Sequence, residues 1–428
     1  MKTWRAHHWF DIASAIPLVA ILSFSLFVVW HFLTEPSYSL GFSIFRTDAS
    51  SSLLGSADQP LKIDQVTSAF QEDKCCRCAL DEEKREKSRR VSPLLHGFSD
   101  TELLKRAIEM ETATSIRYFA KLDCIHSDIA ETKNRKNAGS RVPCPDSCGR
   151  ESTTARVKIA FIFMITTSLP FEALWNKYFQ GKGGRYNIYV HADPFNATLF
   201  ADRSSVFFGR LIPSAKADRG SPSLVMASQR LLANAMLDDP LNQYFALLSG
   251  SCIPIRSFDY GYQKITSSKK SFLEMIIFEP VMEERYRGRE GGAVTMLPEI
   301  PFDKFRKGAH WFVFIRRHAL MMLKDQYENK YWAKFDRPCI VHFCGTDEHY
   351  YHTLFNILEP EGVTGKTVTH VVWPSWPTEH PIMYQSWDIK KELIEDMRNK
   401  DDGHYLFARK FHEDTAESLL ALADLILQ

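Results

Sequence analysis

Two carboxylates stand at the start of an expected helix. The stretch TDEHYYHTLFNI, residues 346–357, has helical spacing of its apolar side chains, and Thr346 is a suitable N-cap. Asp347 and Glu348 then fall in the first turn, where the positive end of the helix dipole favours an ionised carboxylate. Such a carboxylate suits a general base. Glu348, with Asp347 beside it, is therefore a candidate catalytic residue, and capping alone is the alternative.

Two adjacent cations follow a short apolar strand near the C-terminus. In LFARKF, residues 406–411, Arg409 and Lys410 are placed to neutralise a diphosphate without a metal. A solvated surface pair is the alternative. The chain contains no Asp-x-Asp, the pair with which many nucleotide-sugar enzymes hold a divalent metal, so we expect no metal site.

Four further residues have metal-ligand spacing. Cys339, His342, Cys344 and His349 could bind zinc. In an oxidising compartment, a disulfide between Cys339 and Cys344 with surface histidines is favoured over zinc.

Aromatic side chains gather in one proline-broken stretch. Residues 370–387, HVVWPSWPTEHPIMYQSW, contain Trp373, Trp376 and Trp387, and the prolines predict a loop. Exposed aromatic faces in such a loop stack on sugar rings. A hydrophobic hinge against the domain body is the alternative.

Strands that alternate with helices must position these groups. Near-continuous apolar runs predict buried strands, and two segments between them have helical spacing. This alternation indicates an α/β fold with a mostly parallel central sheet. The expected strands are VKIAFIFMITT (157–167), YNIYVHAD (186–193), SSVFFG (204–209) and YFALLSGSCIP (244–254), and the expected helices cover 169–180 and 221–237.

Parallel sheets bind ligands at the carboxyl ends of their strands. Thr166, His191 and Asp193 lie at such ends and are candidates for binding a nucleotide donor. Ordinary polar strand ends are the alternative reading for each of them.

The composition and an N-terminal apolar run bear on the partners and the membrane topology of the chain. The 428 residues include 53 Lys plus Arg against 52 Asp plus Glu, a balance that argues against a nucleic-acid partner. Residues 12–33 carry no charge and are long enough to span a bilayer. Lys2 and Arg5 precede this run, which predicts a cytosolic N-terminus and a lumenal bulk.

The predicted organisation has four parts. A cytosolic tail (1–11) precedes the signal anchor (12–33), a lumenal stem and cysteine-containing pre-domain (34–156) and an α/β domain (157–428). Structural disulfides are favoured over zinc knuckles for the stem cysteines. The total of nine cysteines is odd, which allows a disulfide-linked homodimer through the stem. The stem cysteines are Cys75, Cys76, Cys78, Cys124, Cys144 and Cys148.

A single N-glycosylation sequon begins at Asn196. It follows an expected strand in an expected surface loop, and in the lumen we expect it to be used.

These blocks, in this order, resemble the core-2/I-branching β-1,6-N-acetylglucosaminyltransferase-like proteins, glycosyltransferase family 14, and most closely their plant branch. The resemblance runs from about Lys158 to Phe411. It rests on KIAFIFMITTSLPFEALWNKYF, YNIYVHADP, SSVFFGRLIPSAKADRGSPSLVMASQRLLANAMLDDPLNQYFALLSGSCIPI, FRKGAHWFVFIRRHA, DEHYYHTL and LFARKF.

The resemblance implies a type II Golgi protein with a GT-A-like, Rossmann-like domain that inverts the transferred sugar and needs no metal. By motif position, Glu348 looks like the general base and Lys410, with Arg409, like the cation that stabilises a departing UDP. Glu274 in SFLEM and Trp373 fall near acceptor-binding positions, and Trp311 is grouped with them.

Three positions depart from the family pattern. Gly250 in SGSC stands where many plant members have an acidic residue, and KADRGSP lacks an aromatic-Gly pair. Glu379 and His380 occupy the neighbourhood where the animal enzymes place a second diphosphate-binding arginine.

The sequence therefore predicts a Golgi glycosyltransferase that moves a sugar from a UDP donor to a glycan hydroxyl. N-acetylglucosamine is the leading donor sugar, and glucuronic acid and xylose remain open. The alternative from another class is a catalytically silent lumenal protein that binds glycans or scaffolds other transferases.

Overall fold

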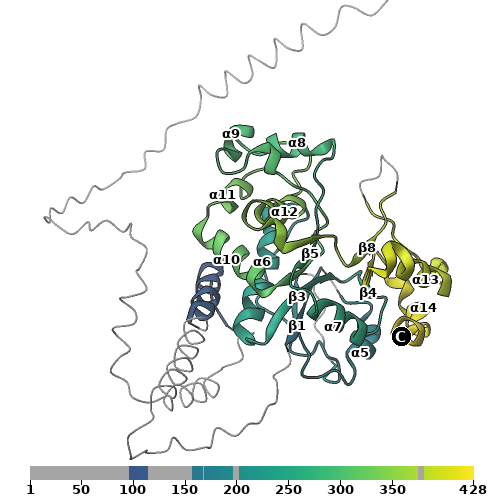
Figure 1. Cartoon of the computed structure of the whole chain (residues 1–428). Coiled ribbons are helices and arrows are strands. Elements are labelled where there is room, and N and C mark those ends of the chain that lie inside the picture. Colours follow the sequence, from purple (N-terminus) through teal and green to yellow (C-terminus); the bar gives the residue numbers. More distant parts are fainter. Residues whose placement is uncertain (1–95, 114–156, 167, 196–201, 375–379) are drawn as a thin grey trace, which may run out of the picture. The chain divides into compact units, whose positions relative to one another are not determined.

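The computed structural model describes residues 96–113, 157–166, 168–195, 202–374 and 380–428 (Figure 1). The predicted tail and anchor, residues 1–33, and the sequon at Asn196 lie outside the described residues. No described helix is long and apolar enough to cross a membrane. Every described residue belongs to one compact unit, residues 79–428.

A six-stranded sheet in the order β2-β1-β3-β6-β5-β7 forms the centre of this unit. β1 pairs in parallel with β2 and β3, and β5 pairs in parallel with β7. Only β6 in this sheet runs antiparallel to its neighbours, so the expected mostly parallel sheet is confirmed. The strands are β1 Lys158–Ile165, β2 Tyr186–Ala192, β3 Asn242–Ser249, β5 Ser271–Glu274, β6 Val313–Ile315 and β7 Val363–Gly365.

Strand β1 is apolar throughout because both of its faces are buried. Successive side chains of a strand point to opposite faces. Ile162 joins a core with residues of α6, whereas Phe161 and Phe163 join a second core with residues of α5. In that second core the ring of Trp175 lies 5.2 Å from that of Phe163.

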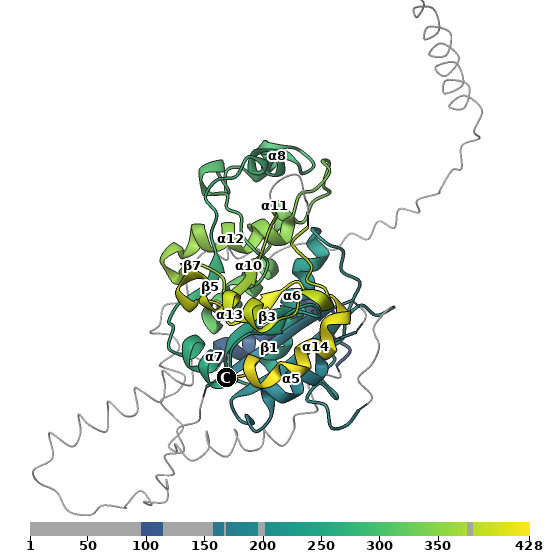
Figure 2. The same ribbon diagram turned by 90° about the vertical axis from the view of Figure 1, so that its right-hand side faces the viewer.

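Helices cover both faces of the sheet. On one side α6 contacts α10 and α12. On the other, α14 contacts α5, and the two lie close together in Figures 1 and 2. The α-helices are α5 Glu172–Phe179, α6 Pro222–Asp238, α7 Phe258–Thr266, α8 Val281–Arg287, α9 Ala293–Met296, α10 Arg316–Glu328, α11 Trp332–Phe335, α12 Thr346–Leu358, α13 Lys391–Asn399, α14 Ala416–Ala421 and α15 Ala423–Ile426.

A helix over residues 100–113 lies within the predicted stem but packs on the α/β body. Leu103 is buried in the same core as residues of α6. Arg316 of α10 donates to Glu111 Oε2 through Nε at 2.8 Å and Nη2 at 2.7 Å. The packed body therefore includes a segment N-terminal to the predicted domain start.

A second, three-stranded sheet brings the C-terminal cations to the main sheet. Its order is β4-β9-β8, with β9 antiparallel to β4 and parallel to β8. β4 (Ile253–Pro254) follows β3 after only a short turn, so β9 (Phe407–Arg409) lies near the carboxyl end of β3. β8 spans Thr369–Val371.

One expected strand is wrong. Residues 204–209, SSVFFG, form turns instead of a strand. Asp202 Oδ1 accepts from Ser204 N at 2.8 Å, and Val206 N donates to Asn176 Oδ1 at 3.0 Å, so side chains satisfy this backbone. Phe207 is buried in the core with α5, and this burial accounts for the apolar pattern.

Candidate active site

Glu348 lies in the first turn of α12, as predicted. The N-cap of α12 is Gly345, whose φ of 56° suits glycine, and not the expected Thr346. Glu348 Oε2 accepts from Arg285 Nη1 at 2.6 Å and lies 3.9 Å from Lys307 Nζ. Within the described part of the chain Glu348 Oε1 accepts no hydrogen bond, which leaves one oxygen able to take a proton.

Asp347 points into the body beside Glu348. Its Oδ2 lies 3.2 Å from His310 Nδ1, and His310 Nε2 is 3.2 Å from both Ser228 Oγ and Tyr351 Oη. Burial raises the pKa of Asp347, but His310 and the charge of Arg219 outweigh it and hold that pKa below its usual value. Asp347 therefore fixes the start of α12 more than it faces a ligand.

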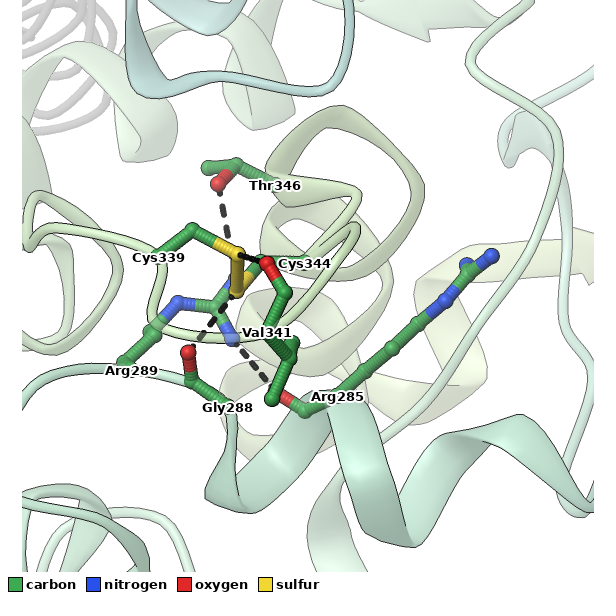
Figure 3. Close-up of a disulfide and its surroundings, with 7 residues drawn as sticks. All are labelled: Arg285, Gly288, Arg289, Cys339, Val341, Cys344 and Thr346. Carbon is green, nitrogen blue, oxygen red and sulfur yellow. Dashed lines mark hydrogen bonds between the residues drawn. A yellow bond between two sulfur atoms is a disulfide. The ribbon is translucent and has the colours of Figure 1, made fainter. Parts of the chain in front are cut away.

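A disulfide in the loop before α12 lies against the end of α8 (Figure 3). The sulfurs of Cys339 and Cys344 lie 2.14 Å apart. The sulfur of Cys344 contacts Gly288 O at 3.1 Å, just after the helix that carries Arg285. In Figure 3 the Arg285 side chain extends away from the disulfide. This link stabilises the two elements that hold the Glu348–Arg285 pair.

Arg289 is buried beneath the same disulfide. Its Nη1 donates to Arg285 O at 2.9 Å, and its Nη2 donates to Thr346 Oγ1 at 3.4 Å. Burial, with a contribution from Arg285, lowers the pKa of Arg289 to about 10.

The zinc alternative does not match this geometry. The thiolates that zinc would need are joined to each other, and His349 is fully buried with Nδ1 2.8 Å from Arg306 O. Among the residues that the structure describes, no group of three or more His, Cys, Asp or Glu could hold a metal ion.

Arg409 and Lys410 lie at the end of β9. The Arg409 guanidinium carbon is 4.2 Å from the centre of the Trp311 ring, and Arg409 Nε is buried without a hydrogen-bond partner in the described structure. Burial lowers the pKa of Arg409, Cys252 opposes this shift and Arg219 adds to it. Burial, then Arg409, then Arg219 lower the pKa of Lys410.

One segment, residues 307–311, contacts both the carboxylates at the start of α12 and Arg409. Besides Lys307 near Glu348, Gly308 N donates to Glu348 O at 3.0 Å. Ala309 N donates to Glu274 Oε2 at 2.8 Å. His310 bonds Asp347, and Trp311 lies against Arg409. The segment thus joins the carboxylates to the C-terminal cation and places the predicted Glu274 and Trp311 between them.

Only glycine fits at position 308, because neighbouring atoms occupy the space of a side chain. A Cβ there would lie 2.4 Å from Glu274 O and 2.5 Å from the ring of His352. Any larger residue would push the 307–311 segment away from β5 and α12.

The candidates at the carboxyl edge of the sheet differ in access. Thr166 is exposed after β1 and Asp193 is partly exposed after β2, so both can face a ligand. His191 is only 1% exposed, and its Nε2 accepts from Ala215 N at 3.4 Å. Burial, with a contribution from Arg230, lowers the pKa of His191 to about 4. His191 therefore supports the neighbouring loop as a neutral ring.

Trp373 is 52% exposed just after β8. Its indole makes no ring contact or hydrogen bond with other described residues, so it is available to an external ring but is not joined to the rest of the site.

Sequence reasoning missed three cations here. Arg285 and Lys307 face Glu348 from α8 and from the 307–311 segment. Arg219, just before α6, donates from Nη1 to His380 Nδ1 at 2.9 Å and lines a cavity of about 450 Å³ together with Phe343 and Thr346. The motifs KADRGSP and MEERYRGR contain these arginines, but their partners lie far away in sequence.

Comparison with known proteins gives two matches. A family model described as Core-2/I-Branching enzyme matches residues 159–398. The chain is also similar to glycosyltransferase BC10 of Oryza sativa subsp. japonica, with 32% identity over 315 residues, which are 62% of this chain and 76% of the rice protein.

Proposed function

The chain belongs to the Core-2/I-branching enzyme family of glycosyltransferases, and from this premise we propose that it transfers a sugar from a UDP donor to a glycan hydroxyl with inversion and without a metal. N-acetylglucosamine is the donor sugar that we favour, with glucuronic acid and xylose as the other candidates. The observation that carries the proposal is the contact of segment 307–311 with both Glu348 and Arg409.

The proposed reaction is a single displacement at the anomeric carbon. Glu348 Oε1 takes the proton of the acceptor hydroxyl as its oxygen bonds to that carbon. The bond from the anomeric carbon to the β-phosphate oxygen breaks, and its electron pair stays on the phosphate. Lys410 and Arg409 stabilise the charge that gathers there. Attack opposite to the leaving group accounts for the inversion.

The remaining candidates are assigned to the two substrates. Thr166 and Asp193, at the exposed sheet edge, are proposed to contact the donor nucleotide, with His191 supporting them from below. Glu274, Trp311 and the exposed Trp373 are proposed to contact the acceptor glycan.

Metal independence is proposed on the chemistry of the residue set. The sequence lacks an Asp-x-Asp pair, and two adjacent cations occupy the end of β9. Cationic side chains can stabilise a departing diphosphate as a bound metal would.

The test is a donor panel with the purified full chain in EDTA. We expect turnover of one UDP-sugar and a product whose anomeric configuration, read by NMR, is opposite to that of the donor. Retention of configuration, or turnover only after addition of a divalent metal, would contradict the proposed mechanism.

A Golgi location with a lumenal domain is a further part of the proposal. It is supported by the uncharged run at 12–33 and the preceding Lys2 and Arg5. If the domain is lumenal, a glycosidase-sensitive mass shift should be present in the parent and absent in Asn196→Gln; no shift in the parent would count against this topology.

A further inference from the structure

Arg219 is connected to the cation pair through the chain segment that runs beside β9. Arg219 Nη1 donates to His380 Nδ1 at 2.9 Å. Four residues later, Tyr384 N donates to Lys410 O at 2.9 Å, and Tyr384 forms a parallel bridge with Phe411. Residues 380–384 therefore link the Arg219 guanidinium to the backbone of Lys410.

Arg219 is also connected to the Glu348 side of the site, through the ring of Phe343. Its guanidinium carbon is 5.8 Å from the centre of the Phe343 ring, and that of Arg285 is 5.0 Å from the same ring. Arg285 in turn bonds Glu348. Arg219 is exposed at the edge of the 450 Å³ cavity, so a ligand can reach it.

The three cations are close enough to oppose one another. The charge of Arg219 lowers the pKa of both Arg409 and Lys410. Within the described ranges neither Arg409 nor Lys410 forms an ion pair with a carboxylate. Clustered like charges cost free energy, which a bound polyanion would offset.

We propose that Arg219 is a third cation of the leaving-group site and binds the diphosphate of the nucleoside diphosphate directly, beside Arg409 and Lys410. This assignment rests on the proposed function and adds a residue from a different element, the segment before α6. When the sugar leaves, the diphosphate gains a negative charge, so a third cation stabilises the product state and the transition state that precedes it. The guanidinium offers paired donors that suit phosphate oxygens.

The experiment compares UDP with uridine, which lacks the diphosphate. Binding of each to the full chain is measured by calorimetry in EDTA for the parent, Arg219→Gln and Arg219→Lys. Arg219→Gln should weaken UDP binding by roughly tenfold, since a hydrogen-bonded charge is lost, and leave uridine binding within about twofold. Arg219→Lys keeps the charge but not the planar guanidinium, so its affinity for UDP should lie between those of the parent and Arg219→Gln.

Lys216→Gln is the matched control, because Lys216 lies three residues before Arg219 and pairs with its own neighbour, Asp218 Oδ1, at 3.1 Å. It should leave UDP binding unchanged. Equal losses for UDP and uridine in Arg219→Gln, or no loss at all, would overturn the proposal.

Lys410→Ala separates this inference from the proposed function. If Lys410→Ala loses UDP affinity and Arg219→Gln does not, the proposed function stands and the role of Arg219 is wrong. If the parent binds no UDP, the proposed function fails, and the assignment of Arg219 falls with it.

Discussion

The two ends of the candidate active site differ in how their charges are compensated. The base end, which we define as Arg285, Lys307, Asp347 and Glu348, pairs both of its carboxylates with groups of the protein itself. The cation end, defined as Arg219, Arg409 and Lys410, differs: Arg219 lowers the pKa of both Arg409 and Lys410, and Arg409 lowers that of Lys410 as well. The carboxylates of the base end are paired within the protein, whereas Arg409 and Lys410 form no ion pair with a carboxylate among the described residues.

This difference matches the role that we propose for each end. A general base must be held in one place with one oxygen open, and the Arg285 bond to Oε2 leaves Oε1 for that purpose. A leaving-group site must be most favourable when charge develops on the ligand, and this suits cations such as Arg409 and Lys410 that pair with no described carboxylate. Burial of such cations costs stability, and this cost is common at functional sites.

The largest expected effect on turnover comes from a substitution at the base end. Glu348→Gln keeps the shape but cannot take a proton, so turnover should fall by about 10²–10⁴-fold. The measurement is the initial rate of sugar transfer at saturating donor. Glu361→Gln, which removes an exposed carboxylate beyond the C-terminal end of α12, is the control and should be as active as the parent. A Glu348→Gln variant as active as the parent would exclude it as the base.

A substitution at the cation end should reduce activity less than the substitution of Glu348. Lys410→Ala removes one charge-stabilising group, and kcat/KM for the donor should fall by about 10²–10³-fold, with weaker UDP binding. Lys366→Ala, which removes an exposed lysine paired with Asp401 Oδ1 at 2.7 Å, should change neither quantity. If Lys410→Ala bound UDP as the parent does, the cation end would not hold the diphosphate.

Removing the disulfide should test the comparison, because both cysteines lie in the loop just before α12, the helix that carries Asp347 and Glu348. The bridge closes a loop with a sequence separation of 5, and a loop this short contributes about 2 kcal/mol in the chain-entropy model. The double variant Cys339→Ser, Cys344→Ser should unfold at a lower temperature at fixed scan rate. Its turnover should fall severalfold while its affinity for UDP stays unchanged. A parallel loss of UDP affinity would mean that the two ends are not independent.

The smallest expected effect is a shift in pH dependence. UDP binding needs Lys410 protonated, and because its pKa is lowered, binding should weaken with rising pH earlier than for an ordinary lysine. Arg219→Gln removes one of the charges that lower this pKa, so the alkaline limb should move to higher pH, by roughly half a unit. Calorimetry across the alkaline range measures it. A limb that stays in place, or moves to lower pH, would argue against the proximity of the two cations.

Local pattern predicted the parts of this molecule that depend on neighbours in sequence. The apolar run of β1 and the Ser221–Pro222 start of α6 were readable because buried strands and helix caps have local signatures. The prediction for residues 204–209 was wrong because burial of Phe207, and not strand pairing, explains the apolar residues there.

The candidate site was predictable only in part for the same reason. Glu348 and the pair Arg409–Lys410 stood out by type and position. Arg285 and Lys307 did not, because their contacts with Glu348 are created by tertiary packing across α8 and the 307–311 segment. No local pattern indicates that residues 308–311, GAHW, contact both Glu348 and Arg409, although Arg409 lies about a hundred residues further along the chain.

The most direct test of the central claim, that the proton and the diphosphate are handled at separate ends, is a calorimetric titration of UDP into Glu348→Gln in EDTA. The account predicts that this variant, although it transfers almost no sugar, binds UDP within about twofold of the parent. A loss of UDP affinity that matched the loss of turnover would contradict it.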